Sequence, residues 1–199
     1  MDKHDLDLST TRNTRYNLSF SLFRLLLKKS YKDITITELC ELASVTRTTF
    51  YRHFGDKRDI FVAFVDERFE EFADTLKDNY DSVSFRDIVF EALKIVKRYR
   101  LQIQKLIDAE LQEILRAQFE QYFSYLFRKT FFNHNELLLD MVAGGSFFYG
   151  AAFYSGAVYS VVIAWAKMNM EGTPDDITDS IIKALVEVNG IDPDKKINI

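Results

Sequence analysis

The stretch from Ile34 to Phe61 reads ITITELCELASVTRTTFYRHFGDKRDIF. It holds a short helical segment, a turn at Ser44 and Val45, and a second short helix that Thr46 can cap. Phe50 and Phe54, four residues apart, share the buried face of that second helix. The side chains left to point outward are Arg47, Thr48, Thr49, Tyr51 and Arg52. Two short helices joined by a tight turn, with hydrogen-bond donors on the second, are typical of proteins that enter the DNA major groove.

The composition is that of a helical globular protein. The chain has 199 residues, of which 47% are hydrophobic and 28% charged, with two prolines and seven glycines. So few helix breakers favour long helices over a turn-rich β fold. The single cysteine, Cys40, excludes an internal disulfide, and the N-terminal residues lack the apolar run of a signal peptide. We therefore expect a cytoplasmic protein.

The charge is unevenly distributed along the chain. The formal net charge is −4, but residues 1–60 carry eleven Lys and Arg against eight Asp and Glu, while residues 61–199 carry fifteen against twenty-two. A locally basic module on an acidic body fits contact with phosphates and restrained non-specific binding. Taken alone, the charge distribution would favour the alternative, a solvated charged face.

Apolar residues recur at helical spacing along the whole chain, which predicts an all-α fold of about nine helices. We expect an N-terminal three-helix domain over residues 1–60 and a larger helical domain over residues 61–199. The first helix is expected from Asn13 to Lys29, and Thr37 is expected to cap the short helix that ends at Ala43. A long helix should begin at Lys57.

The C-terminal helices have their own signals. The polar residues 133–135 predict a break, after which a long helix should run from Glu136 to Asn169. Thr173 is expected to cap a final helix that has Pro174 at its first position.

The residues from Met141 to Ala166 include no charged residue. The length suffices for a membrane span, but serines, glycines and mid-segment tyrosines argue against one, and no membrane contact is expected. Small residues recur every fourth position, which lets another helix approach closely, and the final helix adds an apolar face. We expect a homodimer interface formed by Ala152, Gly156, Ser160, Ala164, Ile177, Ile181, Leu185 and Val188. A simple intramolecular core is the alternative.

No motif in the chain supports catalysis. No His or Cys pair has the spacing of metal ligands, and no phosphate- or dinucleotide-binding fingerprint occurs, so we expect no metal, no cofactor and no enzymatic activity. Several aromatic residues could line a cavity for a small apolar or aromatic effector, although each is also explained by core packing: Tyr99, Phe119, Tyr122, Phe123, Phe147, Tyr149 and Tyr154.

The segment ITELCELASVTRTTFYRHFGDKRDIF resembles the TetR/AcrR family of bacterial transcription regulators, whose pattern A-x-V-[ST]-x-x-T-[FL]-Y-x-H-F it matches. The resemblance covers about Arg12 to Phe61. It implies an all-α homodimer that binds a palindromic double-stranded DNA operator and usually represses. It also implies that Arg47, Thr48 and Tyr51 approach base edges, and that phosphates are held by Thr37, Thr49, His53 and Lys57.

Two residues depart from the family pattern. Ser44 stands where glycine is common in the turn, a position that tolerates a left-handed backbone. Gly55 stands where many members carry lysine, which removes one phosphate contact.

Two other functions remain open at the level of the sequence. A helical adaptor dimer without a direct DNA role could use the uncharged helix to bind a protein or a membrane. A helical enzyme is the second alternative, but it has no catalytic constellation that can be named.

Overall fold

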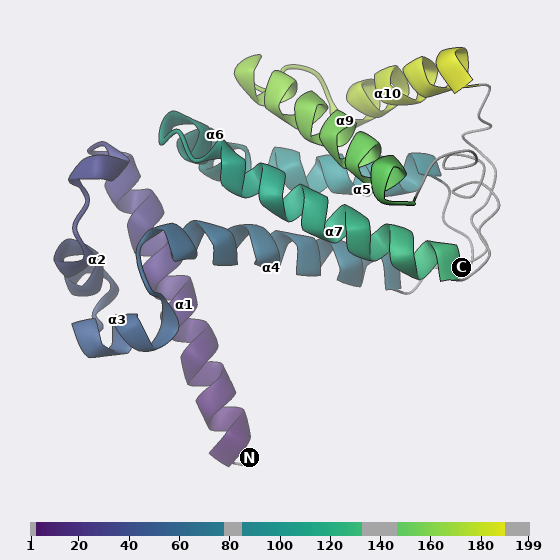
Figure 1. The fold of residues 1–199 in the computed structure, drawn as a ribbon. Helices are drawn as coiled ribbons and strands as arrows, with labels where there is room; N and C mark the ends of the chain where they lie inside the picture. Colours follow the sequence, from purple (N-terminus) through teal and green to yellow (C-terminus); the bar gives the residue numbers. More distant parts are fainter. Residues whose placement is uncertain (1–2, 78–84, 133–146, 190–199) are drawn as a thin grey trace. The chain divides into compact units, whose positions relative to one another are not determined.

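A computed structural model describes residues 3–77, 85–132 and 147–189 (Figure 1). Within these ranges the chain forms nine α-helices, one 3-10 turn and no strand. The elements are α1 (Lys3–Leu26), η1 (Tyr31–Asp33), α2 (Ile36–Ala43), α3 (Arg47–His53), α4 (Arg58–Lys77), α5 (Phe85–Arg98), α6 (Arg100–Asp108), α7 (Gln112–Phe132), α9 (Phe147–Lys167) and α10 (Pro174–Asn189). The expected all-α fold is confirmed.

Several boundaries differ from those expected. Helix α1 begins at Lys3, ten residues before Asn13, and ends at Leu26, three residues before Lys29. The early part of α1 lacks apolar periodicity, so pattern reading placed its start too late. Helix α4 begins at Arg58 because Asp56 Oδ1 accepts the N–H groups of Arg58 and Asp59, at 2.7 and 3.2 Å. The expected break at 133–135 and the helix start at Glu136 lie outside the described residues.

The expected cap at Thr37 is wrong, because Thr35 caps helix α2. Thr35 Oγ1 accepts the N–H of Glu38 at 3.2 Å, and the Glu38 carboxylate accepts the N–H of Thr35 at 2.9 Å. This reciprocal capping box satisfies two groups that helix ends leave without a partner. Thr37 therefore lies inside the first turn of α2, where its side chain is exposed.

The chain separates into two compact units. Unit 1 comprises residues 1–66 and 104–114, and unit 2 comprises residues 67–103 and 115–199. Helices α4, α6 and α7 each contribute residues to both. Unit 1 thus holds the complete N-terminal helix-turn-helix region together with the corner between α6 and α7.

The core of unit 1 is apolar and closely packed. Phe23 contacts Phe61 and Phe64 with ring centroids 5.6 and 4.9 Å apart, both edge to face, the arrangement that aromatic pairs favour. The residues with no exposed surface in this unit are Leu18, Leu22, Leu39, Phe50, Ile60, Phe61 and Leu106. These residues come from α1, α2, α3, α4 and α6, so each short helix is anchored by at least one side chain.

In unit 2, polar contacts fix α5 to the C-terminal helices. The guanidinium of Arg86 binds Asp175 at 2.8 Å and Asp179 at 2.6 Å, both on α10. At the other end of α5, Lys97 donates to the carbonyls of Met170 and Gly172 in the turn after α9. As expected, Thr173 caps α10 and Pro174 is its first residue.

Helix α9 has one covered face and one open face. Ser155, Val162, Trp165 and Ala166 are buried, whereas Ala152, Ser160 and Ala164 are exposed, as are Tyr149 and Phe153, with 72% and 66% of their surface exposed. A Cβ added at Gly156 would meet nothing within 4 Å. None of the helices in the described part of the chain is long and apolar enough to cross a membrane.

The ionisation of Glu38 should control how acid affects unit 1. Its pKa is lowered from 4.5 to about 2, first by the hydrogen bond from Lys29 and then by those from the backbone and side chain of Thr35. Because the pKa is lower in the folded state, this stabilisation is complete above about pH 4.5 and is lost as the pH falls toward about 2.

We expect Glu38→Gln to lower the thermal unfolding temperature at pH 7, since glutamine keeps the capping geometry but loses the charge facing Lys29. The difference from the wild type should shrink between pH 4.5 and 2, as measured by circular dichroism. Glu41→Gln, exposed on the same helix, is the control and should behave like the wild type. A difference that persists unchanged at pH 2 would contradict the ionic origin.

Candidate DNA-binding surface

The turn between α2 and α3 depends on Ser44. This residue adopts a left-handed backbone with φ 55° and ψ 42°, and its N–H and that of Val45 bind the carbonyls of Glu41 and Cys40 at the end of α2. A non-glycine residue pays about 1–2 kcal/mol for this conformation. Ser44 thus adopts the left-handed backbone that glycine commonly provides in this turn, and the turn is not displaced along the chain. The turn sets the angle at which α3 leaves α2.

Helix α3 is short, and two features hold it in place. Thr46 Oγ1 accepts the N–H of Thr49 at 3.0 Å, which confirms the expected cap. Phe50 has no exposed surface and Phe54 only 5%. The opposite face is therefore left to solvent, and Arg47, Thr48, Tyr51 and Arg52 are exposed on it.

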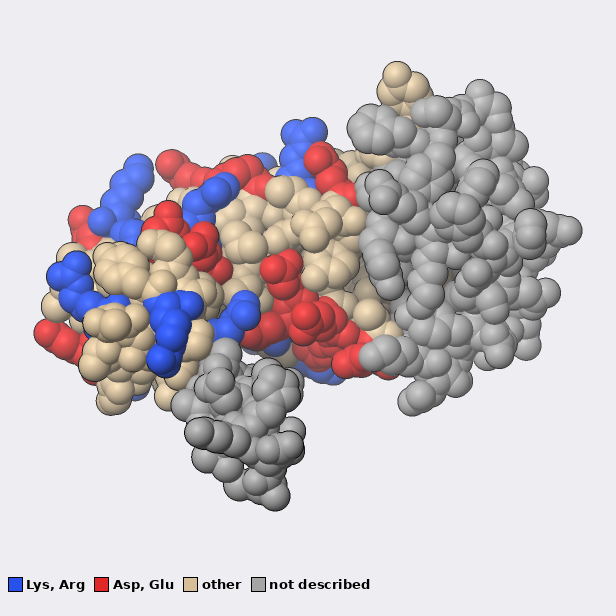
Figure 2. Space-filling model, turned by 60° about the horizontal axis from the view of Figure 1, so that its bottom comes forward, with Lys and Arg blue, Asp and Glu red and all other residues tan. Residues whose placement is uncertain are grey.

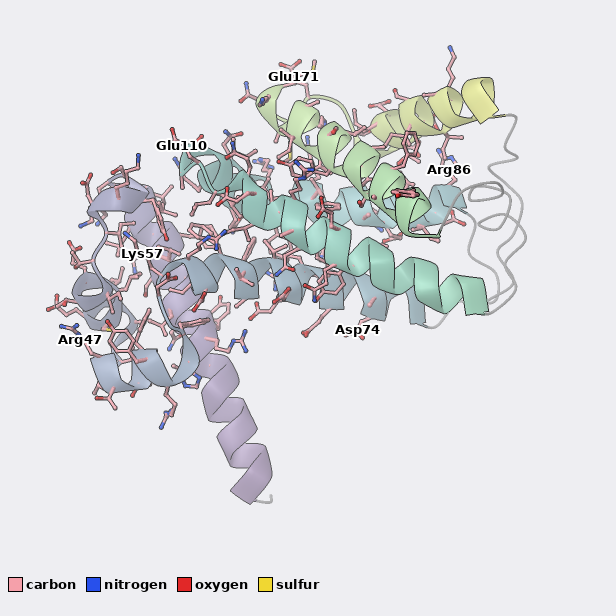
Figure 3. All side chains as sticks on the ribbon, in the orientation of Figure 1. Arg47, Lys57, Asp74, Arg86, Glu110 and Glu171 are labelled. Atoms are coloured by element: carbon pink, nitrogen blue, oxygen red, sulfur yellow. The ribbon has the colours of Figure 1, made fainter. Side chains whose placement is uncertain are left out.

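The exposed face of α3 has an internal order of its own. The Arg47 guanidinium carbon lies 6.0 Å from the centre of the Tyr51 ring, and this ring stands edge to face with Phe50 at 5.3 Å. Through this contact the buried phenylalanine supports the exposed tyrosine, and the tyrosine supports the arginine. Figure 3 shows Arg47 pointing away from the rest of unit 1.

The arginines of this face differ from most cations in unit 2. Within the described ranges, Arg47 and Arg52 form no ion pair, and neither does Arg15 of α1. In unit 2, by contrast, Arg86, Arg98 and Arg116 each bind a carboxylate. Figure 2 shows Lys and Arg side chains on the described surface, with Asp and Glu side chains among them. Cations without carboxylate partners are available to bind phosphate.

The residues expected to hold phosphates fall into two groups. Thr37 is exposed, while Thr49 and His53 are half-buried. The Thr49 hydroxyl lies 2.9 Å from the Thr46 hydroxyl, so it shares its hydrogen-bonding capacity with the cap. Lys57, the last of the set, is held inside unit 1.

Lys57 is bound to the protein itself. Its Nζ donates to the carbonyls of Tyr31 and Ile34 at 2.6 and 2.7 Å and lies 4.3 Å from the centre of the Tyr31 ring. Burial lowers the pKa of Lys57 and raises the pKa of Tyr31 to about 12, so the phenol remains neutral at physiological pH. These contacts tie the segment before α2 to the segment before α4 (Figure 3).

Gly55 also has a local explanation. Its N–H donates to Asp59 Oδ2 at 2.7 Å, and a Cβ at this position would lie 3.1 Å from the same oxygen. Glycine therefore allows the close approach of the Asp59 carboxylate, which also accepts the N–H of Asp56 at 3.3 Å.

Two arginines of this end were not assigned to DNA from the sequence. Arg52 follows Tyr51 on the exposed face of α3, a position that the Phe50 and Phe54 spacing already indicated. Arg15 lies on α1 with its guanidinium carbon 5.6 Å from the centre of the Phe54 ring. No local sequence signal could place Arg15 beside α3, because the two residues are 39 positions apart in the chain.

The residues expected to line an effector cavity are only partly brought together. Phe119 and Tyr122 of α7 contact Phe69 of α4, which the sequence did not suggest; the rings of Phe69 and Tyr122 are stacked at 4.1 Å. Tyr159 of α9 adds a further edge contact to Phe119 at 6.2 Å. We refer to Phe69, Phe119, Tyr122 and Tyr159 as the aromatic cluster.

The other expected cavity residues lie apart from the aromatic cluster or outside the described side chains. Tyr99 donates its hydroxyl to Glu71 at 3.0 Å, and Tyr149 is exposed. The side chains of Phe123, Phe147 and Tyr154 are outside those described.

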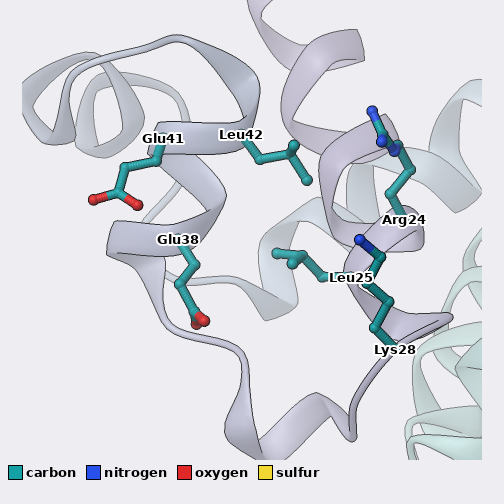
Figure 4. Close-up of a pocket in the computed structure, with 6 residues that line it drawn as sticks. All are labelled: Arg24, Leu25, Lys28, Glu38, Glu41 and Leu42. Atoms are coloured by element: carbon teal, nitrogen blue, oxygen red, sulfur yellow. The ribbon is translucent and has the colours of Figure 1, made fainter.

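A hollow is instead found on unit 1, between α1 and α2, where Leu25 and Leu42 form an apolar floor (Figure 4). Glu38 and Glu41 stand on its α2 side, and Arg24 and Lys28 on its α1 side. It is open to solvent and contains none of the residues expected to bind an effector.

The fold and the surface define a helix-turn-helix DNA-binding protein, and two family models extend this assignment. The model described as bacterial regulatory proteins of the tetR family matches residues 22–64. The model described as a transcriptional regulator C-terminal region matches residues 84–186. The chain therefore belongs to the TetR family, and it is a DNA-binding transcriptional regulator.

Solved structures share this fold. Lin0861 from Listeria innocua superposes with a TM-score of 0.71 at 20% identity, over 90% of this chain and 92% of that one. The dihydroxyacetone kinase operon activator DhaS superposes with a TM-score of 0.53 at 16% identity, over 89% and 96%. No curated protein sequence matches the chain.

We expect Lys57→Met to act on stability more than on phosphate contact. The change leaves two carbonyls without their charged donor, which should cost about 1.5–3 kcal/mol in the free energy of unfolding. The slope of log affinity against log salt should stay at the wild-type value. Arg52→Met, at an exposed position, is the control and should unfold like the wild type. Wild-type stability with a slope reduced by about 0.9 per phosphate would instead identify Lys57 as a phosphate ligand.

Proposed function

We propose that the protein is a homodimeric repressor that binds a palindromic operator through α3 and is released by a small apolar or aromatic effector. The observation that carries the DNA-reading part is the exposed face of α3, where arginines without a carboxylate partner stand on a helix fixed by Phe50 and Thr46. A rigid helix that presents donors is what base readout requires.

Three residues of α3 would read bases in this proposal. Arg47 can bind guanine O6 and N7 with two hydrogen bonds, the Thr48 methyl can contact the methyl of thymine, and Tyr51 can reach a base edge. Thr37, Thr49 and His53 would bind phosphates and fix the register without reading sequence. Lys57 contributes by holding the segment before α2, from which α2 and then α3 extend.

The dimer is supported by the open face of α9. Ala152, Gly156, Ser160 and Ala164 lie on this face at spacing four and none is buried. Ile177 and Ile181 of α10 are half-buried, and the side chains of Leu185 and Val188 are outside those described. Small residues on an apolar helix allow a second helix to pack closely, and an uncovered apolar face costs free energy in water. A second copy of the chain would cover it.

The effector would act on the distance between the two helix-turn-helix regions of the dimer, one in unit 1 of each copy, which we call the reading heads. Two half-sites one helical turn apart, about 34–36 Å, need a fixed spacing of the two α3 helices. An effector that binds a differently spaced conformation more tightly shifts the population away from the one that binds DNA. Helix α4 starts next to Lys57 and contributes Phe69 to the aromatic cluster, so a ligand at the cluster would touch the helix that leads out of the head.

The regulatory direction follows from where the operator lies. A dimer bound over a promoter excludes polymerase, and this is the outcome we propose. DhaS is an operon activator, but at 16% identity it shares only the fold with this chain. A reporter driven by the promoter beside the bound site should rise in activity when this regulator is deleted.

We expect the wild type to select fragments with a palindromic site from genomic DNA at near-physiological salt. Arg47→Ala or Tyr51→Ala should each weaken binding to that site by about 1–3 kcal/mol and relax the sequence preference at one position. Gel shift or fluorescence anisotropy with substituted duplexes measures both effects, and Leu101→Ala, exposed in unit 2, is the control. Wild-type affinity in both α3 variants would contradict DNA reading by this face.

We expect Gly156→Glu to abolish the dimer while leaving the protomer folded. Glutamate favours helix more than glycine does, and the added side chain meets nothing within 4 Å in the protomer, whereas in an interface it would bury a charge. Sedimentation equilibrium should show a dimer for the wild type and a monomer for the variant. Ala117→Glu, at an exposed position of α7, is the matched control, and a dimeric Gly156→Glu protein would place the interface elsewhere.

A further inference from the structure

Arg15 is held beside α3, and among the residues that the structure describes its charge has no counter-ion. Its guanidinium carbon is 5.6 Å from the ring centre of Phe54, at the end of α3. The side chain is half-buried, and its Nε is buried without a hydrogen-bond partner among the residues that the structure describes. Nor does Arg15 form an ion pair within those ranges. A partly desolvated guanidinium without a carboxylate is unfavourable unless an anion binds it.

The first half of α1 precedes Leu18, the first core residue described on this helix. Of the side chains before Leu18, those from Asn13 to Asn17 are described, and all are exposed or half-buried. Figure 1 shows this first half of α1 extending past α3, which belongs to the same unit. At 1.5 Å per residue, the segment from Lys3 to Arg15 is about 18 Å long.

The charge of this helix is entirely basic after Asp7. No Asp or Glu occurs from Leu8 to Lys32, a range with six basic residues, and residues 9–17 read STTRNTRYN. Arg12 lies one helical turn before Arg15 in the chain. The acidic residues Asp5 and Asp7 occupy the first turns of α1, where the helix dipole favours negative charge. The basic segment therefore begins after Asp7 and leads to the side of α3.

We propose that the segment of α1 from Leu8 to Arg15 is a second DNA contact, which binds the phosphate backbone next to the groove that α3 enters. Arg15 is the fixed point of this contact and Arg12 extends it toward the N terminus. This inference rests on the proposed function, since it needs α3 to be on DNA. Arginine suits the role because its planar fork matches phosphate oxygens and remains charged at all physiological pH values.

The contact contributes to affinity and register and carries no base preference. Backbone contacts release condensed counter-ions, so their signature is the salt dependence of binding. Because a homodimer carries each substitution twice, removal of one arginine removes two phosphate contacts per dimer. The magnitude of the slope of log affinity against log salt should therefore fall by about 1.8 for Arg15→Gln, and by a similar amount for Arg12→Gln.

The experiment compares Arg15→Gln and Arg12→Gln with Arg24→Gln on the duplex that the wild type selects. Arg24 is exposed on the same helix nine residues after Arg15, which places it on the opposite side of α1. Arg24→Gln therefore removes the same charge from the other side of the helix and is the matched control. Affinity is measured from 0.05 to 0.3 M salt, over which the Debye length shortens from about 13 Å to about 5 Å, together with hydroxyl-radical footprints. For Arg15→Gln and Arg12→Gln we expect a reduced slope and an affinity lowered about tenfold at 0.15 M salt. We also expect these two variants to lose protection at the outer edges of the site, whereas Arg24→Gln should keep the wild-type slope and footprint.

The outcomes separate this inference from the proposed function. If the wild type binds its site and both Arg15→Gln and Arg12→Gln keep the wild-type slope and footprint, the second contact is excluded, while operator binding by α3 remains supported. If the wild type itself selects no sequence, both proposals fall. Because Arg15 packs on Phe54, circular dichroism of each variant is recorded, and Arg15→Lys, which keeps the charge, should retain the wild-type slope. A slope lost equally in Arg24→Gln would show a general charge effect and overturn the assignment to this face.

Discussion

The surface that we propose to read DNA depends on the burial of one side chain, Phe50. Helix α3 has seven residues, fewer than an isolated helix needs to be stable in water, so its existence and its rotation about its own axis are set by tertiary contacts. Phe50 has no exposed surface, and this fixes which side of α3 faces solvent. Arg47 then rests on Tyr51, and Tyr51 on the Phe50 ring. The polar face is thus ordered from the core outward.

Much of the helix-turn-helix region could be predicted from the sequence, because the residues that define its helices and caps lie close together in the chain. The spacing of Phe50 and Phe54 predicted the exposed residues of α3 except at Thr49, which is half-buried against the cap, and the expected cap at Thr46 is confirmed. The cap of α2 was misassigned to Thr37, although Thr35 and Glu38 stand at the spacing of a capping box. Two Thr residues at alternate positions compete for this role, and the one that finds a reciprocal carboxylate three residues later caps the helix.

What the sequence could not show are contacts between residues far apart in the chain. Lys57 binds carbonyls 23 and 26 residues earlier, and nothing around Lys57 distinguishes such a lysine from a phosphate ligand. The same holds for Arg15 beside Phe54 and for Phe69 stacked on Tyr122. The apolar character of α9 was evident from its composition, but its covered side is defined by contacts with distant residues, such as Trp165 with Lys97 of α5 and Tyr159 with Phe119 of α7.

The corner between α6 and α7 has a consequence for how this regulator could be recombined with others. Residues 104–114 belong to unit 1, where Leu106 and Ile114 are buried and Arg58 binds Glu113 at 3.4 Å. The head is therefore discontinuous in sequence. A chimaera that transplants only the first 66 residues would separate the head from part of its own core and would place a foreign corner against it. A transplant of the DNA-binding unit of this protein must therefore include residues 104–114 as well as the first 66 residues. The DNA-binding unit and this part of the larger helical region can only be exchanged together.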